Sequence, residues 1–236
     1  MITETIKRNL NPPEEFIYGF SDLRGLIHKK YSHYPYGISI GKRLNNSIVD
    51  GIMDGPTLDY YRHYKQVNKE LSAVAHKITS DLKKTGVDAV VIEPTVSTES
   101  KEFEKYLETL TVEVSHKMVA TRAGLGWIGK TDLFVSRAFG PRLRLVSLLI
   151  SEQPAHEPRP IEKSRCGSCQ ICVDKCPAGA ANGILWNTAI HRDLFFNAQR
   201  CRETCGRLAM ERLKVNVRIC GICVAVCPIG EKRRRV

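Results

Sequence analysis

The chain has 236 residues, of which 42% are hydrophobic, and a formal net charge of +11 at pH 7. It holds no apolar run long enough to cross a bilayer, which excludes a spanning helix, and residues 1–10 do not resemble a signal peptide. We therefore expect a soluble, cytoplasmic protein with no membrane contact, one main core and a small second domain. The positive charge is weak evidence for nucleic-acid binding, because no aromatic-rich motif accompanies it.

The strongest helix signal spans Thr57–Thr85, with Pro56 at its start and Gly86 after its end. In the turn before it, Asp54 or Thr57 is expected to cap the helix. Helical spacing predicts an apolar face formed by Leu58, Tyr61, Tyr64, Val67, Leu71, Val74 and Ile78. On this assignment Tyr60 and His63 fall on the opposite, exposed face.

Three further elements follow along the chain. Asp88–Pro94 is rich in valine and isoleucine and is bounded by Gly86, as expected of a buried strand. Val112–Ala123 is expected to be a second helix that ends at Gly124, and Leu143–Ile150 a second apolar strand. This order of helices and strands predicts an α+β or α/β sandwich.

A glycine-rich loop lies between these elements, at Ala123–Thr131. It lacks Walker A spacing, and its G-x-G-x-x-G string follows a helix instead of a strand, which argues against nicotinamide binding. Two interpretations stay open for the loop. It is either a ligand-binding loop, in which backbone amides approach the ligand closely, or a helix C-cap followed by a tight turn.

The C-terminal part carries the most specific motif, Cys166-x2-Cys169-x2-Cys172-x3-Cys176-Pro177, which is echoed by Cys220-x2-Cys223-x3-Cys227-Pro228. This is the spacing of a module with two [4Fe–4S] clusters, in which the Cys-Pro cysteine ligates the other cluster. That rule assigns one cluster to Cys166, Cys169, Cys172 and Cys227, and the other to Cys176, Cys201, Cys220 and Cys223. The ninth cysteine, Cys205, is an alternative to Cys201.

Zinc binding and a disulfide framework are the alternatives to iron–sulfur binding. Neither predicts two Cys-Pro endings. Oxygen-sensitive clusters and reduced thiols also point to a reducing compartment, and to an anaerobic or oxygen-poor way of life.

The string Arg122-Ala-Gly-Leu-Gly-Trp-Ile-Gly-Lys130, followed by an apolar strand and the first cysteine motif, resembles epoxyqueuosine reductase over roughly residues 110 to 230. The resemblance implies a nitroreductase-like, cobalamin-binding domain (1–155) joined to a ferredoxin-like double-cluster domain (156–236), as in reductive dehalogenases. It further implies that the clusters pass electrons to the corrinoid. The corrinoid-contacting candidates are then Gly124, Gly126, Trp127, Gly129, Lys130 and Thr131.

Three departures argue against tRNA epoxide reduction by this chain alone. The family's Asp-Thr-x-Pro segment, whose aspartate is the proton donor, is replaced by Leu110-Thr-Val-Glu113. The sequence also ends nine residues after Cys227, and its amino-terminal part matches only loosely.

The candidates for a proton donor in catalysis are Glu113, Tyr60 and His116, with Tyr61, His63 and Tyr64 as further possibilities. Each has a plainer explanation: core packing for Tyr61 and Tyr64, an exposed surface for Tyr60 and His63, and an ordinary half-buried side chain for His116.

The sequence thus predicts a cobalamin-dependent iron–sulfur reductase with an undetermined substrate, served by an external electron donor such as a ferredoxin or flavodoxin. One alternative is an electron-transfer or corrinoid-activating protein without a small substrate of its own. Another is an iron–sulfur oxidoreductase that binds FMN. The basic tail 232–235 would suit nucleic acid or an acidic donor, although a solvated tail is the simpler expectation.

Overall fold

The computed structural model describes residues 1–96, 102–155 and 158–230. The helices are α1 (Ile2–Asn9), α2 (Asn46–Asp50), α3 (Leu58–Lys83), α4 (Glu102–Thr109), α5 (His116–Arg122), α6 (Ile171–Asp174), α7 (Ala198–Leu213) and α8 (Ile222–Ala225), with 3-10 turns at Pro13–Glu15, Lys29–Tyr31, Arg192–Leu194 and Pro228–Gly230. The strands are β1 (Phe16–Asp22), β2 (Tyr36–Arg43), β3 (Ala89–Ile92), β4 (Gly126–Ile128), β5 (Phe134–Ser136) and β6 (Leu143–Ile150). This mixture confirms the predicted α+β class. None of the described helices is long and apolar enough to cross a membrane.

The chain divides into two compact units that are interleaved in sequence. The first unit comprises Met1–Arg43, Val67–Leu125 and Arg144–Ile161, and the second comprises Leu44–Gln66, Gly126–Leu143 and Glu162–Val236. Segments 44–66 and 126–143 therefore group with the cysteine-bearing part of the chain. A functional division near residue 155 stays a prediction.

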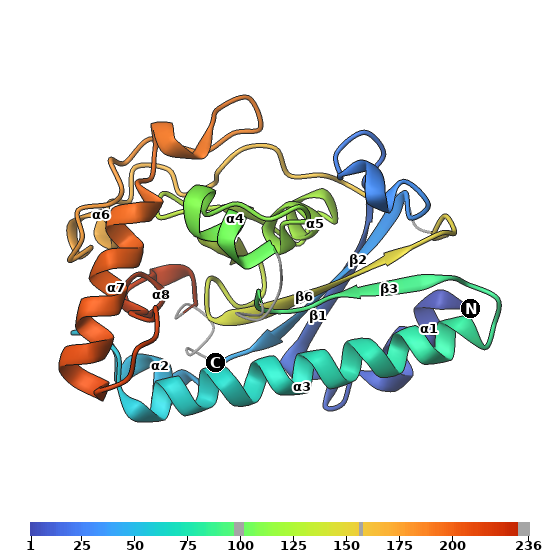
Figure 1. Ribbon diagram of the computed structural model, residues 1–236, viewed down its shortest axis with the longest axis horizontal. Helices are drawn as coiled ribbons and strands as arrows, with labels where there is room; N and C mark the ends of the chain where they lie inside the picture. Colours follow the sequence, from blue (N-terminus) through green and yellow to red (C-terminus); the bar gives the residue numbers. More distant parts are fainter. Residues whose placement is uncertain (97–101, 156–157, 231–236) are drawn as a thin grey trace. The chain divides into compact units, whose positions relative to one another are not determined.

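The first unit is built on a four-stranded sheet in the order β1-β2-β6-β3 (Figure 1). Strands β1 and β2 are antiparallel, with Gly19 opposite Ser39 and Phe20 opposite Ile38. Successive side chains of a strand point to opposite faces, so small residues share one face of this pair and large apolar residues the other. The small face receives α5: a Cβ atom on Gly19 would lie 3.2 Å from the Cβ of Ala123.

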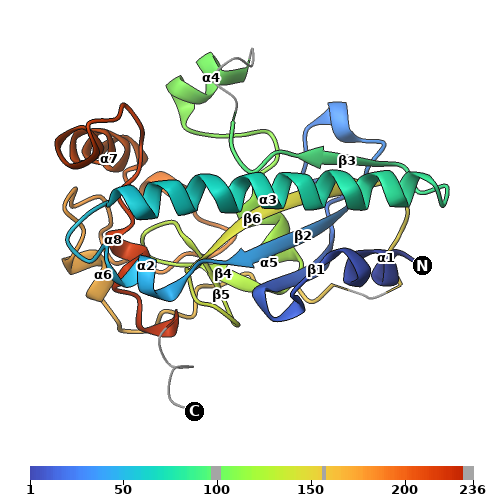
Figure 2. The same cartoon turned by 90° about the horizontal axis from the view of Figure 1, so that it is seen from below.

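Within the first unit, α3 runs alongside the sheet (Figures 1 and 2). Its polar side chains reach the strands or the residues next to them: Asn68 accepts a 2.9 Å hydrogen bond from Arg144 of β6, and Ser72 donates a 2.8 Å bond to Glu93, just after β3. These bonds fix the helix along the sheet.

The predicted limits of α3 agree with the structure, and its cap is the Thr57 hydroxyl, which accepts a 3.2 Å hydrogen bond from the Tyr60 amide. The predicted apolar face is correct at Val67, Leu71 and Ile78, which are buried, whereas Val74 is only partly buried. It is wrong at the first turn, where Leu58 is 45% exposed and Tyr60 only 5% exposed. The reason is that Tyr60 packs against Gly221 in the second unit.

The second predicted helix begins later than expected. Helix α5 starts at His116, after Ser115, whereas residues 110–115 form a loop in which Leu110 has a positive φ of 50°. Its end was predicted correctly, because Gly124 adopts a φ of 72° directly after the last turn. Strand β6 matches the predicted Leu143–Ile150.

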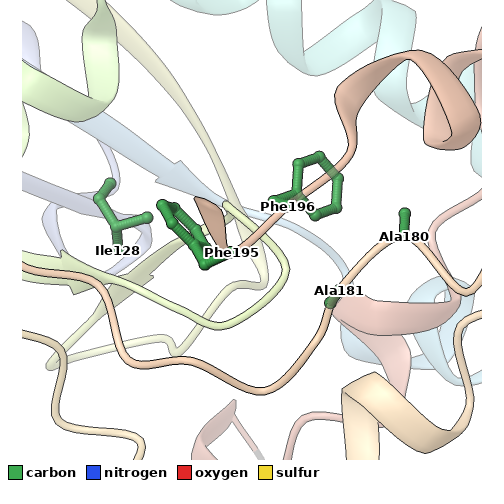
Figure 3. Close-up of a cluster of buried hydrophobic side chains, with 5 residues drawn as sticks. All are labelled: Ile128, Ala180, Ala181, Phe195 and Phe196. Carbon is green, nitrogen blue, oxygen red and sulfur yellow. The ribbon is translucent and has the colours of Figure 1, made fainter. Parts of the chain in front are cut away.

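The second unit contains the β4–β5 hairpin and most of the C-terminal part of the chain. Its buried apolar cluster comprises Ile128, Ala180, Ala181, Phe195 and Phe196 (Figure 3). Through Ile128, which lies beside Phe195 in this cluster, the hairpin is anchored to the segment between the two cysteine motifs. A buried ion pair adds to this unit: Arg142, 1% exposed, donates to Asp50 and to the Ala225 carbonyl oxygen, each at 2.8 Å.

Candidate metal centre

The two cysteine motifs form short loops, each of which contains one turn of helix. The first motif includes helix α6, and the second includes helix α8. The second loop favours glycine at Gly221, because this residue has a φ of 94° and a Cβ atom there would lie 2.9 Å from the Tyr60 ring. The remaining two cysteines, Cys201 and Cys205, lie on successive turns of α7.

The last cysteine of the chain lies with the first motif, as the crossover rule predicts. Burial raises the pKa of Cys227 to about 11, and the nearby thiols of Cys172, Cys166 and Cys169 add to that rise. The four side chains are thus close enough to interact. They are the four that the sequence assigns to one cluster.

The second predicted set also converges. Burial raises the pKa of Cys223, and the charges of Cys220, Cys201, Cys172 and Cys176 contribute to the same shift. All three of its predicted partners thus act on Cys223, as does Cys172 of the other set.

The ninth cysteine, Cys205, lies beside this second set. Its sulfur is 3.9 Å from the sulfur of Cys201, and its thiol is also hydrogen-bonded to Cys220. These bonds raise the pKa of Cys205 and lower that of Cys201; for Cys220, the bond from Cys205 lowers the pKa to about 7. Cys205 thus lies within hydrogen-bonding distance of both Cys201 and Cys220.

Among the described residues, no three Cys, His, Asp or Glu side chains lie close enough together to bind a single metal ion. In a cubane cluster each thiolate binds a different iron atom, so its four sulfurs are spaced more widely than the ligands of one ion.

The glycines of the Ala123–Thr131 loop are explained by close packing within the chain. A Cβ atom on Gly124 would lie 2.4 Å from the Arg159 carbonyl oxygen, and one on Gly126 would lie 2.1 Å from that of Val135. Gly129 faces Cys166, whose sulfur would be 3.6 Å from an added Cβ. The loop therefore forms a helix C-cap followed by a tight hairpin, and a contact between this loop and a corrinoid stays a prediction.

Side chains of the same loop contact the first cysteine motif. The Trp127 indole N–H donates a 3.4 Å hydrogen bond to the Cys166 sulfur, and the Lys130 ammonium donates a 2.9 Å bond to the Cys169 carbonyl oxygen. The Thr131 side chain is hydrogen-bonded to Cys172. The three side chains are 7%, 2% and 5% exposed. The spacing of the glycines gave no sign of these contacts.

The predicted proton donors belong to different units, Glu113 and His116 to the first and Tyr60 to the second. In the first unit, Glu113 forms an ion pair with Lys30. His116 uses both ring nitrogens, one with the Ser147 hydroxyl at 2.9 Å and the other with the Glu93 carbonyl oxygen at 2.8 Å. Burial lowers the pKa of His116 to about 4.

The other helix candidates have local partners. His63 Nε2 accepts a 2.9 Å hydrogen bond from the Asn45 amide in the second unit, so it is not the plain surface residue that the sequence predicted. Tyr61 and Tyr64 are only half-buried. The basic tail 232–235 lies outside the described residues.

Comparisons with known proteins agree with the cysteine geometry. Residues 165–230 match a 4Fe-4S double cluster binding domain. This double-cluster domain includes all nine cysteines of the chain. The two cysteine motifs and α7 therefore lie within one match to an iron–sulfur domain.

Curated relatives extend the likeness beyond the double-cluster domain. The chain is 38% identical over 120 residues to the epoxyqueuosine reductase of Lactococcus garvieae and 36% identical over 128 residues to that of Bacillus subtilis. These matches cover 48% and 51% of this chain but only 31% and 30% of the relatives. The predicted resemblance to epoxyqueuosine reductases is confirmed, and the chain matches about a third of their length.

Solved structures share the fold over nearly the whole chain. The catabolic reductive dehalogenase NpRdhA, in complex with 3-bromo-4-hydroxybenzoic acid, has a TM-score of 0.66 at 16% identity, over 91% of this chain and 30% of that one. Epoxyqueuosine reductase from Streptococcus thermophilus has a TM-score of 0.58 at 19% identity, over 98% of this chain and 65% of that one. At these identities the likeness establishes the fold alone.

Proposed function

We propose that this chain is an iron–sulfur oxidoreductase whose double-cluster domain holds two [4Fe–4S] clusters. The observation that carries the proposal is the crossover of the last cysteine: Cys227 interacts with Cys166, Cys169 and Cys172, although more than fifty residues separate them in sequence. A module with two clusters requires this arrangement, whereas a pair of separate zinc sites does not. The names of the curated relatives, all reductases, support the same class.

The ligands proposed for the second cluster are Cys176, Cys201, Cys220 and Cys223. We prefer Cys201 to Cys205 as a ligand because Cys201 interacts with Cys223. Cys205 interacts instead with Cys201 and Cys220. In this arrangement Cys205 is a hydrogen-bond donor next to the ligands.

We further propose that the acceptor of the electrons is a bound corrinoid. The support is the fold, which is shared at a TM-score of 0.66 and 15% identity with the protein titled "Reductive dehalogenase structure suggests a mechanism for B12-dependent dehalogenation". A corrinoid, when bound, supplies the reducing chemistry at cobalt. Trp127, Lys130 and Thr131 are buried and hydrogen-bonded to the cysteine motif, so the proposal does not rest on these side chains.

The substrate and the donor are narrower questions. One solved relative is titled as a complex of epoxyqueuosine reductase with a tRNA stem loop, but the segment that replaces the family's aspartate holds Glu113 in an ion pair with Lys30. We therefore favour a substrate other than tRNA. The donor we propose is an external electron carrier such as a ferredoxin or flavodoxin.

The test is anaerobic reconstitution with iron and sulfide, followed by separate titrations with cobalamin and FMN under visible and EPR spectroscopy. We expect about eight irons per chain and tight binding of cobalamin with a base-off Co(II) signal. FMN binding instead would favour a flavin-dependent iron–sulfur oxidoreductase. Binding of neither, with the irons present, would favour an electron carrier.

A further inference from the structure

The β4–β5 hairpin ends in a rigid tip directed at the cysteines of the second unit. The Gly129 amide donates to the Leu133 carbonyl oxygen at 2.8 Å, and the Asp132 amide donates to the Gly129 carbonyl oxygen at 3.0 Å. Next to this turn, Ile128 of β4 packs into the apolar cluster around Phe195 (Figure 3). The side chains at the tip are therefore held in position by the hairpin.

Two side chains of the hairpin, one on β4 and one in the turn, direct hydrogen bonds at thiol sulfurs. The Trp127 indole N–H lies 3.4 Å from the Cys166 sulfur, and the Thr131 side chain is bonded to Cys172. A third, Lys130, is 2% exposed and holds its ammonium group against the Cys169 carbonyl oxygen. The hairpin thus contributes two hydrogen bonds and one positive charge to a single cysteine motif.

A hydrogen bond to a ligand sulfur stabilises the more negative, reduced state of a cluster more than the oxidised state. The effect is largest where water is excluded, because buried charges are poorly screened. At 7% and 5% exposure, Trp127 and Thr131 meet that condition.

We propose that Trp127 and Thr131 are positioning and tuning residues that raise the reduction potential of the cluster ligated by Cys166, Cys169, Cys172 and Cys227. The inference rests on the proposed function, because it needs the cluster to be present. It gives the hairpin a role beyond packing: the hairpin makes one of the two clusters the better electron acceptor, and so helps to set the direction of electron flow.

The test compares Trp127→Phe and Thr131→Val with the wild type in redox titrations monitored by EPR, after the iron content of each has been measured. Both changes remove a donor and keep most of the side-chain volume. The matched control is Trp186→Phe, since Trp186 is the other tryptophan of the chain and packs against the apolar cluster around Phe195.

We expect both variants to retain about eight irons and to lower the same one of the two midpoint potentials, while Trp186→Phe changes neither. Unchanged potentials in both fully loaded variants would overturn the inference. If Trp127→Phe loses a cluster, the midpoint potentials of Thr131→Val alone test the inference. A wild-type protein without iron would instead refute the proposed function, so the two failures are distinguishable.

Discussion

The sulfurs of Cys201 and Cys205 lie 3.9 Å apart on successive turns of α7. The Cys205 thiol also bonds Cys220, and this bond lowers the pKa of Cys220 to about 7. On the proposed assignment, eight of the nine cysteines are cluster ligands and Cys205 is a neighbouring thiol that bonds two of them.

Removal of Cys205 should leave both clusters in place. We expect Cys205→Ala to retain about eight irons per chain, and the double variant Cys201→Ala/Cys205→Ala to retain about four. The double variant is needed because Cys205 is close enough to replace a missing Cys201. A fall to about four irons in Cys205→Ala alone would make Cys205 the ligand instead.

We expect Asp132 to shift a cluster's midpoint potential in the direction opposite to Trp127. The bond from Cys205 lowers the pKa of Cys201, whereas burial and the negative charges of Cys220 and Asp132 oppose that shift. Removal of this negative charge in Asp132→Asn should raise the midpoint potential of the cluster that contains Cys201. Asparagine tolerates the φ of 57° at this position. EPR-monitored titration checks the prediction, and a lowered or unchanged potential contradicts it.

The buried histidine of α5 makes stability depend on pH. The pKa of His116 falls from 6.5 to about 4 on folding, because burial disfavours the charged form. As the pH falls, the unfolded chain binds a proton at His116 before the folded protein does. The contribution of neutral His116 to the free energy of unfolding is therefore complete above pH 6.5 and is lost between pH 6.5 and 4. We expect wild type to lose about 1 kcal/mol more than His116→Gln between pH 7 and 5.5. Parallel stability curves for the two proteins would refute the account of His116.

The hairpin should not tolerate a side chain at Gly126. An added Cβ would lie 2.1 Å from the Val135 carbonyl oxygen, so Gly126→Ala forces β4 and β5 apart and should cost about 1–3 kcal/mol. Gly51→Ala is the control, since its Cβ meets nothing closer than 3.4 Å. Thermal unfolding of the two variants should show a large loss in the first and almost none in the second. Equal melting temperatures would show that the hairpin adapts.

Local patterns predicted several elements well. An apolar run marks strand β6, and a capping threonine and glycines mark the ends of α3 and α5, because these signals act through neighbouring residues. The burial of Tyr60 was not predictable, because it depends on Gly221, which lies far away in sequence. Helical periodicity shows which residues share a face of the helix, but it does not show which face a distant part of the chain will cover.

The double-cluster domain was predictable because iron–sulfur motifs have fixed spacing, and residues 165–230 match such a domain. The assignment of individual cysteines to the two clusters stays a prediction. The contacts around the cysteines were not predictable. Trp127 and Thr131 belong to a glycine loop whose spacing is typical of ligand-binding loops as well as of tight turns, and only the fold of the hairpin brings them to Cys166 and Cys172. Arg142 likewise gave no signal before its buried pair with Asp50 was seen.

The most direct test of the central claim is the iron and acid-labile sulfide content of the anaerobically reconstituted protein, measured for wild type and Cys227→Ala. The account predicts about eight irons and eight sulfides in wild type. In Cys227→Ala it predicts a loss confined to the cluster of the first motif, with about four of each remaining. Zinc without sulfide, or a Cys227→Ala variant that loses the cluster of its own motif instead, would contradict it.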